Sequence, residues 1–447
     1  MTLSDQEIKE LNLIQDWYQL IESEFKIVKP ENGEFWHLCD AKQNAELPIY
    51  SWYNLKEAFS SKFPVWVIER LQELYKFRPS KVLDPFVGGG TSLLSISQLG
   101  IEVTGVEYNP FIGWVSLVKS NWSLYDELEI SNAILVLNWN QPKRQQIPEL
   151  STLNNEKYFR KKDVQLLIYI IGQIDNLSIT EYSKDFLKIG VVSIVEAFGN
   201  LKKDGRALRY VEKSTGSNIQ TLLLDRWNKQ LEEVIEIKKT WQKTSKANLL
   251  FGGATNLTNL IHKNGKVEVV GLTNAQYDLV LYSPPYLNNF DYSEIYKVEL
   301  WLLGFLKNQE QWVRLRKGTL KSHPSVKFDF LDYLMRDART KIIAENIELL
   351  TKNKKLNKNM PEVIKGYFND IYLSLKEQYR VLKPGGFLVY NVSNSKHGSL
   401  PIATDLIIAE IAKKIGFMPL ELVELHNRNG RKKGSLLRES VVFMRKG

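Results

Sequence analysis

The hydrophobic pattern of this chain alternates between two kinds of segment. Short apolar runs that end at glycine, proline or an acidic residue predict buried strands near 82–83, 102–106, 277–282 and 387–392. Segments with apolar residues at helical spacing lie between these runs, for example at 64–75. Strands and helices that alternate in this way indicate an α/β fold.

The alternation is interrupted twice. Between 119 and 246 several amphipathic helices follow one another without a clear strand, at 163–173, 184–198 and 219–241. The segment 311–362 is rich in lysine and arginine. We therefore predict an N-terminal helical cap or arm at 1–46, a core in three parts at 47–118, 247–310 and 363–447, a helical insertion at 119–246 and a basic insertion at 311–362.

Composition narrows the class of protein. Of the 447 residues, 43% are hydrophobic and 25% are charged, as in ordinary globular proteins, and no apolar stretch is long enough to span a bilayer. The first ten residues are polar and acidic, so we expect no signal peptide and no membrane partner. The single cysteine, Cys39, excludes an internal disulfide and a cysteine-based zinc site, and the five histidines have no ligand spacing, so we expect no metal. A cytoplasmic location follows as the expectation.

The charge balance points to a polyanion partner. Lysine and arginine number 60 against 51 acidic residues, which gives a net charge of +9. Two basic segments could contact phosphates, one at 202–210 and one at 428–433; for the first, a solvated charged loop is an equally good interpretation. The candidate phosphate-binding residues are Lys202, Lys203, Arg206, Arg209, Arg428, Arg431 and Lys432.

A glycine-rich turn follows the first predicted strand. The sequence D-P-F-V-G-G-G-T at 84–91 joins this strand to a helix at 92–99, where a ligand can approach the backbone closely and meet unpaired N–H groups. The next strand ends at Glu107, and an acidic residue at this position commonly binds ribose hydroxyls. The spacing differs from the dinucleotide pattern and favours a nucleoside without a pyrophosphate. A third edge of this pocket is expected at 249–254.

A second chemical signal is the tetrapeptide S-P-P-Y at 283–286, directly after a buried strand. The Ser283 hydroxyl and the Pro284 carbonyl can accept hydrogen bonds from an exocyclic amine, and Tyr286 can stack on a flat heterocycle. By itself the tetrapeptide is equally consistent with a strand that ends in a proline-rich turn beside a buried tyrosine.

Together these motifs resemble those of the amino-group DNA methyltransferases. D-P-F-V-G-G-G-T is similar to the S-adenosylmethionine loop of that family, usually D-P-F-x-G-S-G-T, and S-P-P-Y is similar to its catalytic motif. F-S-S-K-F-P at 59–64, R-V-L-K-P-G-G at 380–386 and R-E-S-V-V-F at 438–443 resemble further family segments. The sequence departs from the family at Gly89, where serine is usual, and at Gly253, where an aspartate is frequent.

The resemblance implies a fold, a cofactor and a site. The fold is a Rossmann-like, seven-stranded, mostly parallel sheet with a C-terminal antiparallel hairpin, and the helical insertions are added to it. The cofactor is S-adenosyl-L-methionine, and the partner is double-stranded DNA, with a cognate restriction endonuclease as a further expectation. The implied catalytic residues are Ser283, Pro284, Pro285 and Tyr286. The implied cofactor-binding residues are Phe59, Ser60, Asp84, Pro85, Phe86, Gly88, Gly90, Thr91, Glu107, Tyr108 and Ala254.

The resemblance also indicates the methylated atom. Within the family, S-P-P-Y occurs mostly in enzymes that act on cytosine N4, whereas N-P-P-Y and D-P-P-Y are commoner for adenine N6. We therefore expect cytosine-N4 methylation and keep adenine N6 as the alternative. An RNA methyltransferase and an inactive DNA-binding homologue remain as further alternatives. The two insertions are the candidates for target recognition and DNA contact.

Overall fold

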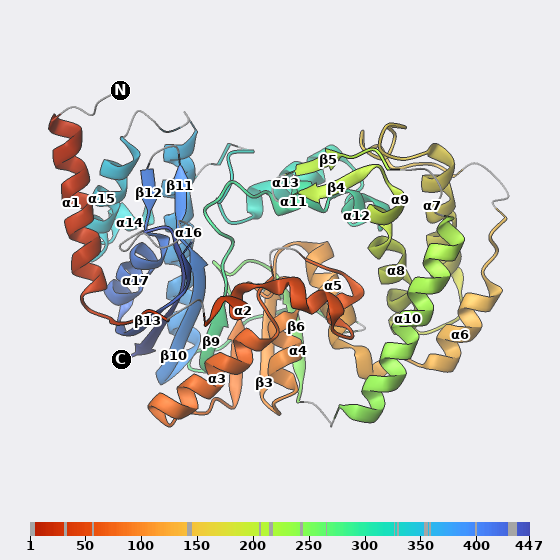
Figure 1. The fold of residues 1–447 in the computed structure, drawn as a ribbon, viewed down its shortest axis with the longest axis horizontal. Coiled ribbons are helices and arrows are strands. Elements are labelled where there is room, and N and C mark those ends of the chain that lie inside the picture. Colours follow the sequence, from red (N-terminus) through yellow and green to blue (C-terminus); the bar gives the residue numbers. More distant parts are fainter. Residues whose placement is uncertain are drawn as a thin grey trace.

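A ten-stranded sheet forms the body of the protein (Figure 1). The structure is a computed structural model that describes residues 5–30, 34–55, 58–140, 145–204, 207–213, 218–241, 245–264, 266–325, 327–328, 330–352, 356, 359–397, 400–427 and 436–447. The strand order is β1-β13-β14-β10-β9-β2-β3-β6-β7-β8. The bounds of the ten strands are β1 Lys26–Val28, β2 Lys81–Asp84, β3 Glu102–Glu107, β6 Ala247–Phe251, β7 Leu260–Asn264, β8 Lys266–Val270, β9 Tyr277–Tyr282, β10 Leu382–Ser393, β13 Phe417–Asn427 and β14 Arg438–Lys446.

The seven central strands confirm the predicted Rossmann-like sheet. From β6 through β3, β2 and β9 to β10 all neighbours are parallel, and β14 pairs antiparallel with both β10 and β13. The three outer strands were not predicted. Strand β1 has only three residues, and in the edge strand β8 Val267, Glu268 and Val269 are all exposed, so this strand lacks the buried apolar run by which the central strands are predicted.

Helices cover both faces of this sheet because its strands are apolar on both faces. In β9, Leu279 and Leu281 pack toward α3 (Lys62–Tyr75) and α4 (Thr91–Ser97), whereas Val280 and Tyr282 pack toward the opposite layer. That layer contains α1 (Asp5–Glu22), α15 (Lys341–Thr351), α16 (Met360–Val381) and α17 (Thr404–Ile415). Near-continuous apolar strands are typical of parallel sheets buried in this way.

The helical insertion forms a second group of helices to the right in Figure 1. It contains α6 (Glu127–Val136), α7 (Lys161–Asn176), α8 (Glu181–Ser193), α9 (Val195–Phe198) and α10 (Ile219–Thr240). Its core also takes in residues from outside the insertion, among them Trp52 and Trp301. The predicted basic loop at 202–210 is wrong as a description of the backbone, because Leu201–Asp204 (β4) and Ala207–Tyr210 (β5) pair as an antiparallel hairpin.

Shorter elements complete the described chain. They are α2 (Trp36–Cys39), α5 (Pro110–Ser120), α11 (Tyr292–Ile295), α12 (Lys297–Leu302), α13 (Gln309–Gly318), α14 (Tyr333–Arg336), β11 (Ser395–His397), β12 (Leu400–Ile402) and the 3₁₀ turns Ala41–Glu46, Tyr50–Trp52 and Trp122–Leu124. Among the helices that the structure describes, none is both long and apolar enough to cross a lipid bilayer.

Candidate active site

A cavity of about 360 Å³ lies at the carboxyl ends of β2, β3, β6 and β9. The chain runs from β2 outward through β3 to β6 and then returns to β9 on the other side of β2. Crevices at such a reversal of strand order are the usual ligand sites of open α/β sheets. The walls come from residues after each of these strands and from the segment Lys317–His323, which begins in the last two residues of α13.

The turn after β2 depends on glycine. Gly88 and Gly90 have φ values of +55° and +85°, a region that side-chain-bearing residues rarely adopt. A Cβ on Gly90 would also lie 2.6 Å from the hydroxyl oxygen of Ser116 on α5. The turn therefore keeps its backbone close to α5 and open toward the cavity.

Asp84 stabilises this turn through hydrogen bonds. Its carboxylate accepts hydrogen bonds from the Ser92 hydroxyl and from the backbone N–H of Phe86, the latter at 3.0 Å. The side chain is fully buried, and burial raises its pKa to about 7. Asp84 does not line the cavity. Its hydrogen bonds therefore fix the shape of the turn and do not reach the cavity.

Glu107 lies in the cavity wall and joins two of its loops. One carboxylate oxygen accepts from the Gly88 N–H at 3.1 Å, and the other accepts from the Asn109 N–H at 2.8 Å. Burial raises the pKa of Glu107 to about 7. The carboxylate retains acceptor capacity on the cavity side, since each oxygen has a second lone pair.

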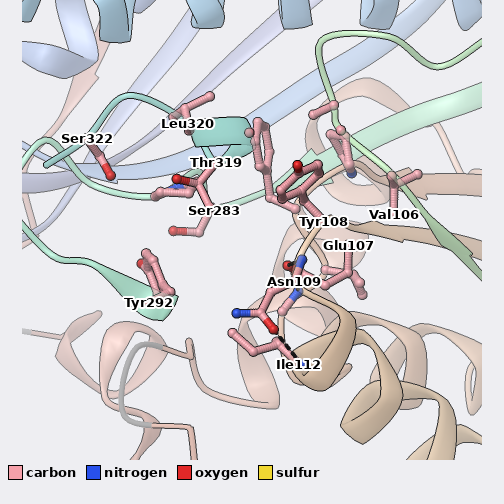
Figure 2. A pocket seen from close by; sticks show the side chains of 18 of the residues that line it. Val106, Glu107, Tyr108, Asn109, Ile112, Ser283, Tyr292, Thr319, Leu320 and Ser322 are labelled. Atoms are coloured by element: carbon pink, nitrogen blue, oxygen red, sulfur yellow. Dashed lines mark hydrogen bonds between the residues drawn. The ribbon is translucent and has the colours of Figure 1, made fainter. Parts of the chain in front are cut away.

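Asn109 is a site residue that the sequence analysis did not identify. Its side-chain oxygen caps α5 by accepting from the N–H groups of Phe111 at 3.0 Å and Ile112 at 3.3 Å. The amide nitrogen has no hydrogen-bond partner although the side chain is only 3% exposed. Figure 2 shows this nitrogen directed toward the open part of the pocket. An Asn-Pro pair at a helix start predicts a cap, and only the fold shows that the second amide atom points into the cavity.

The S-P-P-Y turn brings Ser283 into the same cavity. Ser283 and Pro285 line the cavity, whereas Pro284 is buried. The Pro285 carbonyl accepts a hydrogen bond of 3.0 Å from the hydroxyl of Tyr367 on α16. The strand end is therefore held rigidly against the helix layer.

The structure corrects the expected position of Tyr286. Its hydroxyl donates to Glu439 on β14 at 2.9 Å and accepts from the Asn391 amide on β10 at 3.3 Å. Because these two bonds hold the phenol against the neighbouring strands, its ring is not part of the cavity wall. The aromatic ring that does line this side of the cavity belongs to Tyr292 (Figure 2).

The segment Lys317–His323 forms a wall that the sequence analysis placed only within a basic insertion. Buried Asp291, in the loop after S-P-P-Y, accepts two hydrogen bonds from Arg316, at 2.8 and 2.6 Å. On the opposite side, Asp370 of α16 binds Lys321 through its backbone N–H at 3.1 Å and its ammonium group at 2.7 Å. Two buried carboxylates thus fix this segment above the cavity.

The predicted cofactor-binding residues divide into two groups. Those that line the cavity are Phe59, Pro85, Phe86, Gly88, Thr91, Glu107, Tyr108 and Ala254. Those that support it without lining it are Ser60, Asp84 and Gly90. Gly253, which stands where an aspartate is frequent in the family that the sequence resembles, also lines the cavity beside Tyr108.

The predicted phosphate-binding residues differ in their exposure to solvent, and some lie outside the described part of the chain. Lys203 is only 7% exposed, and its ammonium group binds Glu299 of α12 and the hydroxyl of Tyr53, so the prediction that it contacts phosphate is wrong. Lys202 and Arg209 are exposed on the other face of the hairpin. Four predicted residues lie outside the described part of the chain: Arg206, Arg428, Arg431 and Lys432.

Comparison with known proteins identifies relatives of one kind, although no family model matches the chain. The type II methyltransferase M.AvaI of a Nostoc species is 26% identical over 408 residues, which cover 87% of this chain and 83% of that protein. The type II methyltransferase M.BsoBI of Geobacillus stearothermophilus is 26% identical over 92% of this chain and 86% of its own length. The type II methyltransferase M.MvaI of Kocuria varians is 24% identical over 75% and 74% of the two chains.

Among solved structures, the rRNA methyltransferase AviRa from Streptomyces viridochromogenes aligns with 87% of this chain and 85% of its own. The TM-score is 0.30 and the sequence identity is 9%.

Proposed function

Because the chain is a homologue of type II methyltransferases over most of its length, we propose that it is a site-specific DNA methyltransferase. It transfers a methyl group from S-adenosyl-L-methionine to the N4 amine of cytosine in double-stranded DNA, in the cytoplasm. One observation carries the proposal. Glu107 at the end of β3 and Ser283 at the end of β9, on either side of β2, line one cavity. In this proposal Glu107 binds the nucleoside and the Ser283 hydroxyl binds the target amine within that cavity.

The cofactor side of the cavity fits a nucleoside. Glu107 can accept hydrogen bonds from ribose hydroxyls, the unpartnered amide nitrogen of Asn109 can donate one, and Tyr108 offers a ring for the adenine. The glycine turn at Gly88–Gly90 lets the rest of the molecule approach the backbone. When bound, the cofactor supplies a methyl group that its positively charged sulfur already activates.

The target side of the cavity fits a flat base. Figure 2 shows Ser283, Tyr292 and Ser322 around one open part of the pocket. A base inside a duplex cannot reach such a pocket, so we infer that the target nucleotide is rotated out of the helix. Stacking on an aromatic ring replaces part of the stacking that the base loses, and Tyr292 is the ring in this wall.

The role of Ser283 follows from the chemistry of an exocyclic amine. The nitrogen lone pair is delocalised into the ring, so the amine is a poor nucleophile. A hydrogen bond from its N–H to the Ser283 hydroxyl oxygen favours a pyramidal nitrogen with a localised lone pair. The Pro284 carbonyl is the second acceptor in this proposal. The protein then contributes chiefly by holding the reacting atoms in position.

A pair of measurements tests the proposal. Purified protein is incubated with radiolabelled cofactor and duplex DNA, the DNA is digested to nucleosides, and the labelled product is identified by mass. N4-methylcytosine supports the proposal, and N6-methyladenine shows that the methylated base is adenine. If the DNA carries no label while RNA added in a parallel incubation does, the proposal is contradicted. The Ser283→Ala variant should lose roughly 100-fold or more in kcat and retain its affinity for the cofactor in calorimetry.

A partner endonuclease belongs to the same proposal. Relatives named as type II methyltransferases favour a restriction-modification system for this chain as well. Sequencing the methylome of a host that expresses the chain gives the recognition sequence. A cognate endonuclease should cut unmethylated host DNA at that sequence and leave the methylated DNA intact.

A further inference from the structure

Four polar side chains form a hydrogen-bonded group that extends from the cavity wall into the sheet. The Ser283 hydroxyl donates to the Tyr286 hydroxyl at 3.3 Å, and the Tyr286 hydroxyl donates to the Glu439 carboxylate at 2.9 Å. The Asn391 amide donates to the same Tyr286 oxygen at 3.3 Å and to the same Glu439 oxygen at 3.1 Å. Ser283 lies in the cavity wall, and Glu439 lies on β14, where it is 9% exposed.

The direction of these hydrogen bonds follows from the groups involved. An ionised carboxylate only accepts, so the Tyr286 O–H must donate to Glu439. Burial raises the pKa of Tyr286 well above its ordinary value, and the negative charge of Glu439 adds to this, so the phenol keeps its proton. The Tyr286 oxygen is then an acceptor for Ser283 and Asn391. The hydroxyl hydrogen of Ser283 points into the sheet, and its lone pairs are left for the cavity.

We propose that Glu439, acting through Tyr286, positions the Ser283 hydroxyl as an acceptor and receives the proton that the target amine loses. This inference rests on the proposed function and adds two positioning residues to it, one from the loop after β9 and one from β14. Hydrogen bonds in a chain polarise one another, so the carboxylate at the inner end strengthens the acceptor at the outer end.

The proton balance of this relay is simple. When the amine nitrogen gains a methyl carbon, one N–H bond must break. That proton passes to the Ser283 oxygen, the Ser283 proton passes to the Tyr286 oxygen, and the Tyr286 proton passes to the Glu439 carboxylate. Serine and tyrosine end as they began, and Glu439 ends as a carboxylic acid that returns its proton to solvent.

The test compares single and combined variants in the full-length protein. Glu439→Gln and Tyr286→Phe should each lower kcat roughly tenfold or more, with little change in the affinity for S-adenosyl-L-methionine measured by calorimetry. Glu439→Asp, which restores a carboxylate, should recover part of kcat. In a Ser283→Ala background Glu439→Gln should have no further effect, because residues that act as one unit are not additive.

Glu421 provides a matched control. It is a fully buried carboxylate on the neighbouring strand β13 and accepts from Arg70 at 2.6 and 2.8 Å. Glu421→Gln should lower the melting temperature without a selective loss of kcat. The inference is overturned if Glu439→Gln turns over like the wild type, or if its loss adds fully to that of Ser283→Ala. If wild-type protein methylates no DNA amine, the proposed function fails instead.

Discussion

The backbone of Gly318 lies directly against the hydroxyl of Tyr108. A Cβ built on Gly318 would lie 1.7 Å from that oxygen. Tyr108 belongs to the proposed cofactor side of the cavity, and Gly318 lies in the wall that Asp291 and Asp370 hold in place. The two halves of the site therefore meet at this contact.

The first prediction concerns this contact. Gly318→Ala should displace the Tyr108 ring and weaken cofactor binding by about 1 kcal/mol, or about fivefold in Kd, because overpacked contacts cost energy of this order. Calorimetric titration with the cofactor measures the effect. Gly172→Ala in α7 is the control, since a Cβ there meets no atom within 4 Å. Equal affinity of both variants and the wild type would show that the contact does not shape the site.

Asn109 gives a second prediction. Asn109→Asp keeps the oxygen that caps α5 but replaces the unpartnered donor in the cavity with a negative charge beside Glu107. The affinity for the cofactor should fall roughly tenfold, the cost of a lost hydrogen bond with added charge repulsion. The control is Asn218→Asp, because Asn218 caps α10 in the same way on the protein surface. If Asn109→Asp binds the cofactor with the wild-type Kd, the Asn109 amide does not contact the cofactor.

The pKa of Glu107 predicts how cofactor binding varies with pH. Because burial raises this pKa to about 7, the folded protein holds a proton on Glu107 at pH values between its ordinary pKa of 4.5 and about 7. Ribose hydroxyls need the ionised form, so affinity should rise as the pH rises toward 7 and level off above it. Below pH 7 binding should release a proton, which calorimetry detects as a dependence on the buffer's ionisation enthalpy.

The raised pKa of Glu107 also affects the stability of the protein. Here the effect of rising pH has the opposite sign to its effect on cofactor affinity. Between pH 4.5 and about 7 the native state binds more protons than the unfolded state at this carboxyl, so its contribution to the free energy of unfolding falls as the pH rises. Glu107→Gln should weaken both pH dependences. A Glu107→Gln protein whose cofactor affinity still rises toward pH 7 would contradict the assignment.

The β4–β5 hairpin gives a prediction about DNA. Lys202 and Arg209 are direct cross-strand partners, both exposed, and like charges in this position destabilise a hairpin. The ammonium nitrogen of exposed Lys157 lies over the Tyr210 ring, 4.3 Å from the ring centroid. On its other face the hairpin is fixed by buried Lys203. We expect Lys202 and Arg209 to contact DNA phosphates.

Lys202→Glu separates binding from folding. It creates an opposite-charge pair with Arg209, so the melting temperature should stay the same or rise. DNA affinity should nevertheless fall about tenfold at about 0.05 M salt, with a salt dependence reduced by about one phosphate contact. Lys9→Glu on α1, at the far left of Figure 1, is the control and should bind DNA normally. Unchanged DNA binding by Lys202→Glu would show that this face of the hairpin does not contact DNA.

The sequence was informative wherever a local rule applies. A short apolar strand followed by D-P-F-V-G-G-G-T predicts a glycine turn with an open backbone, and Gly88 and Gly90 have the required positive φ. The sequence was less informative about which way a side chain faces. Whether Tyr286 faces the cavity depends on Glu439, 153 residues away, and whether Lys203 faces solvent depends on Glu299. Both partners come from other elements, so no local pattern predicts them.

By itself, the sequence determined the α/β class, four of the central strands and the two motifs that follow them, because these depend on apolar periodicity and on glycine and proline geometry within a few residues. The count of seven strands came from the resemblance to a family. Only the tertiary structure decided that Lys317–His323 lines the cavity, that Asn109 directs its amide nitrogen into it, and that Glu439 accepts a hydrogen bond from Tyr286. These features depend on hydrogen bonds and ion pairs between segments far apart in the chain, and such partners are chosen by packing of the whole sheet and its helices.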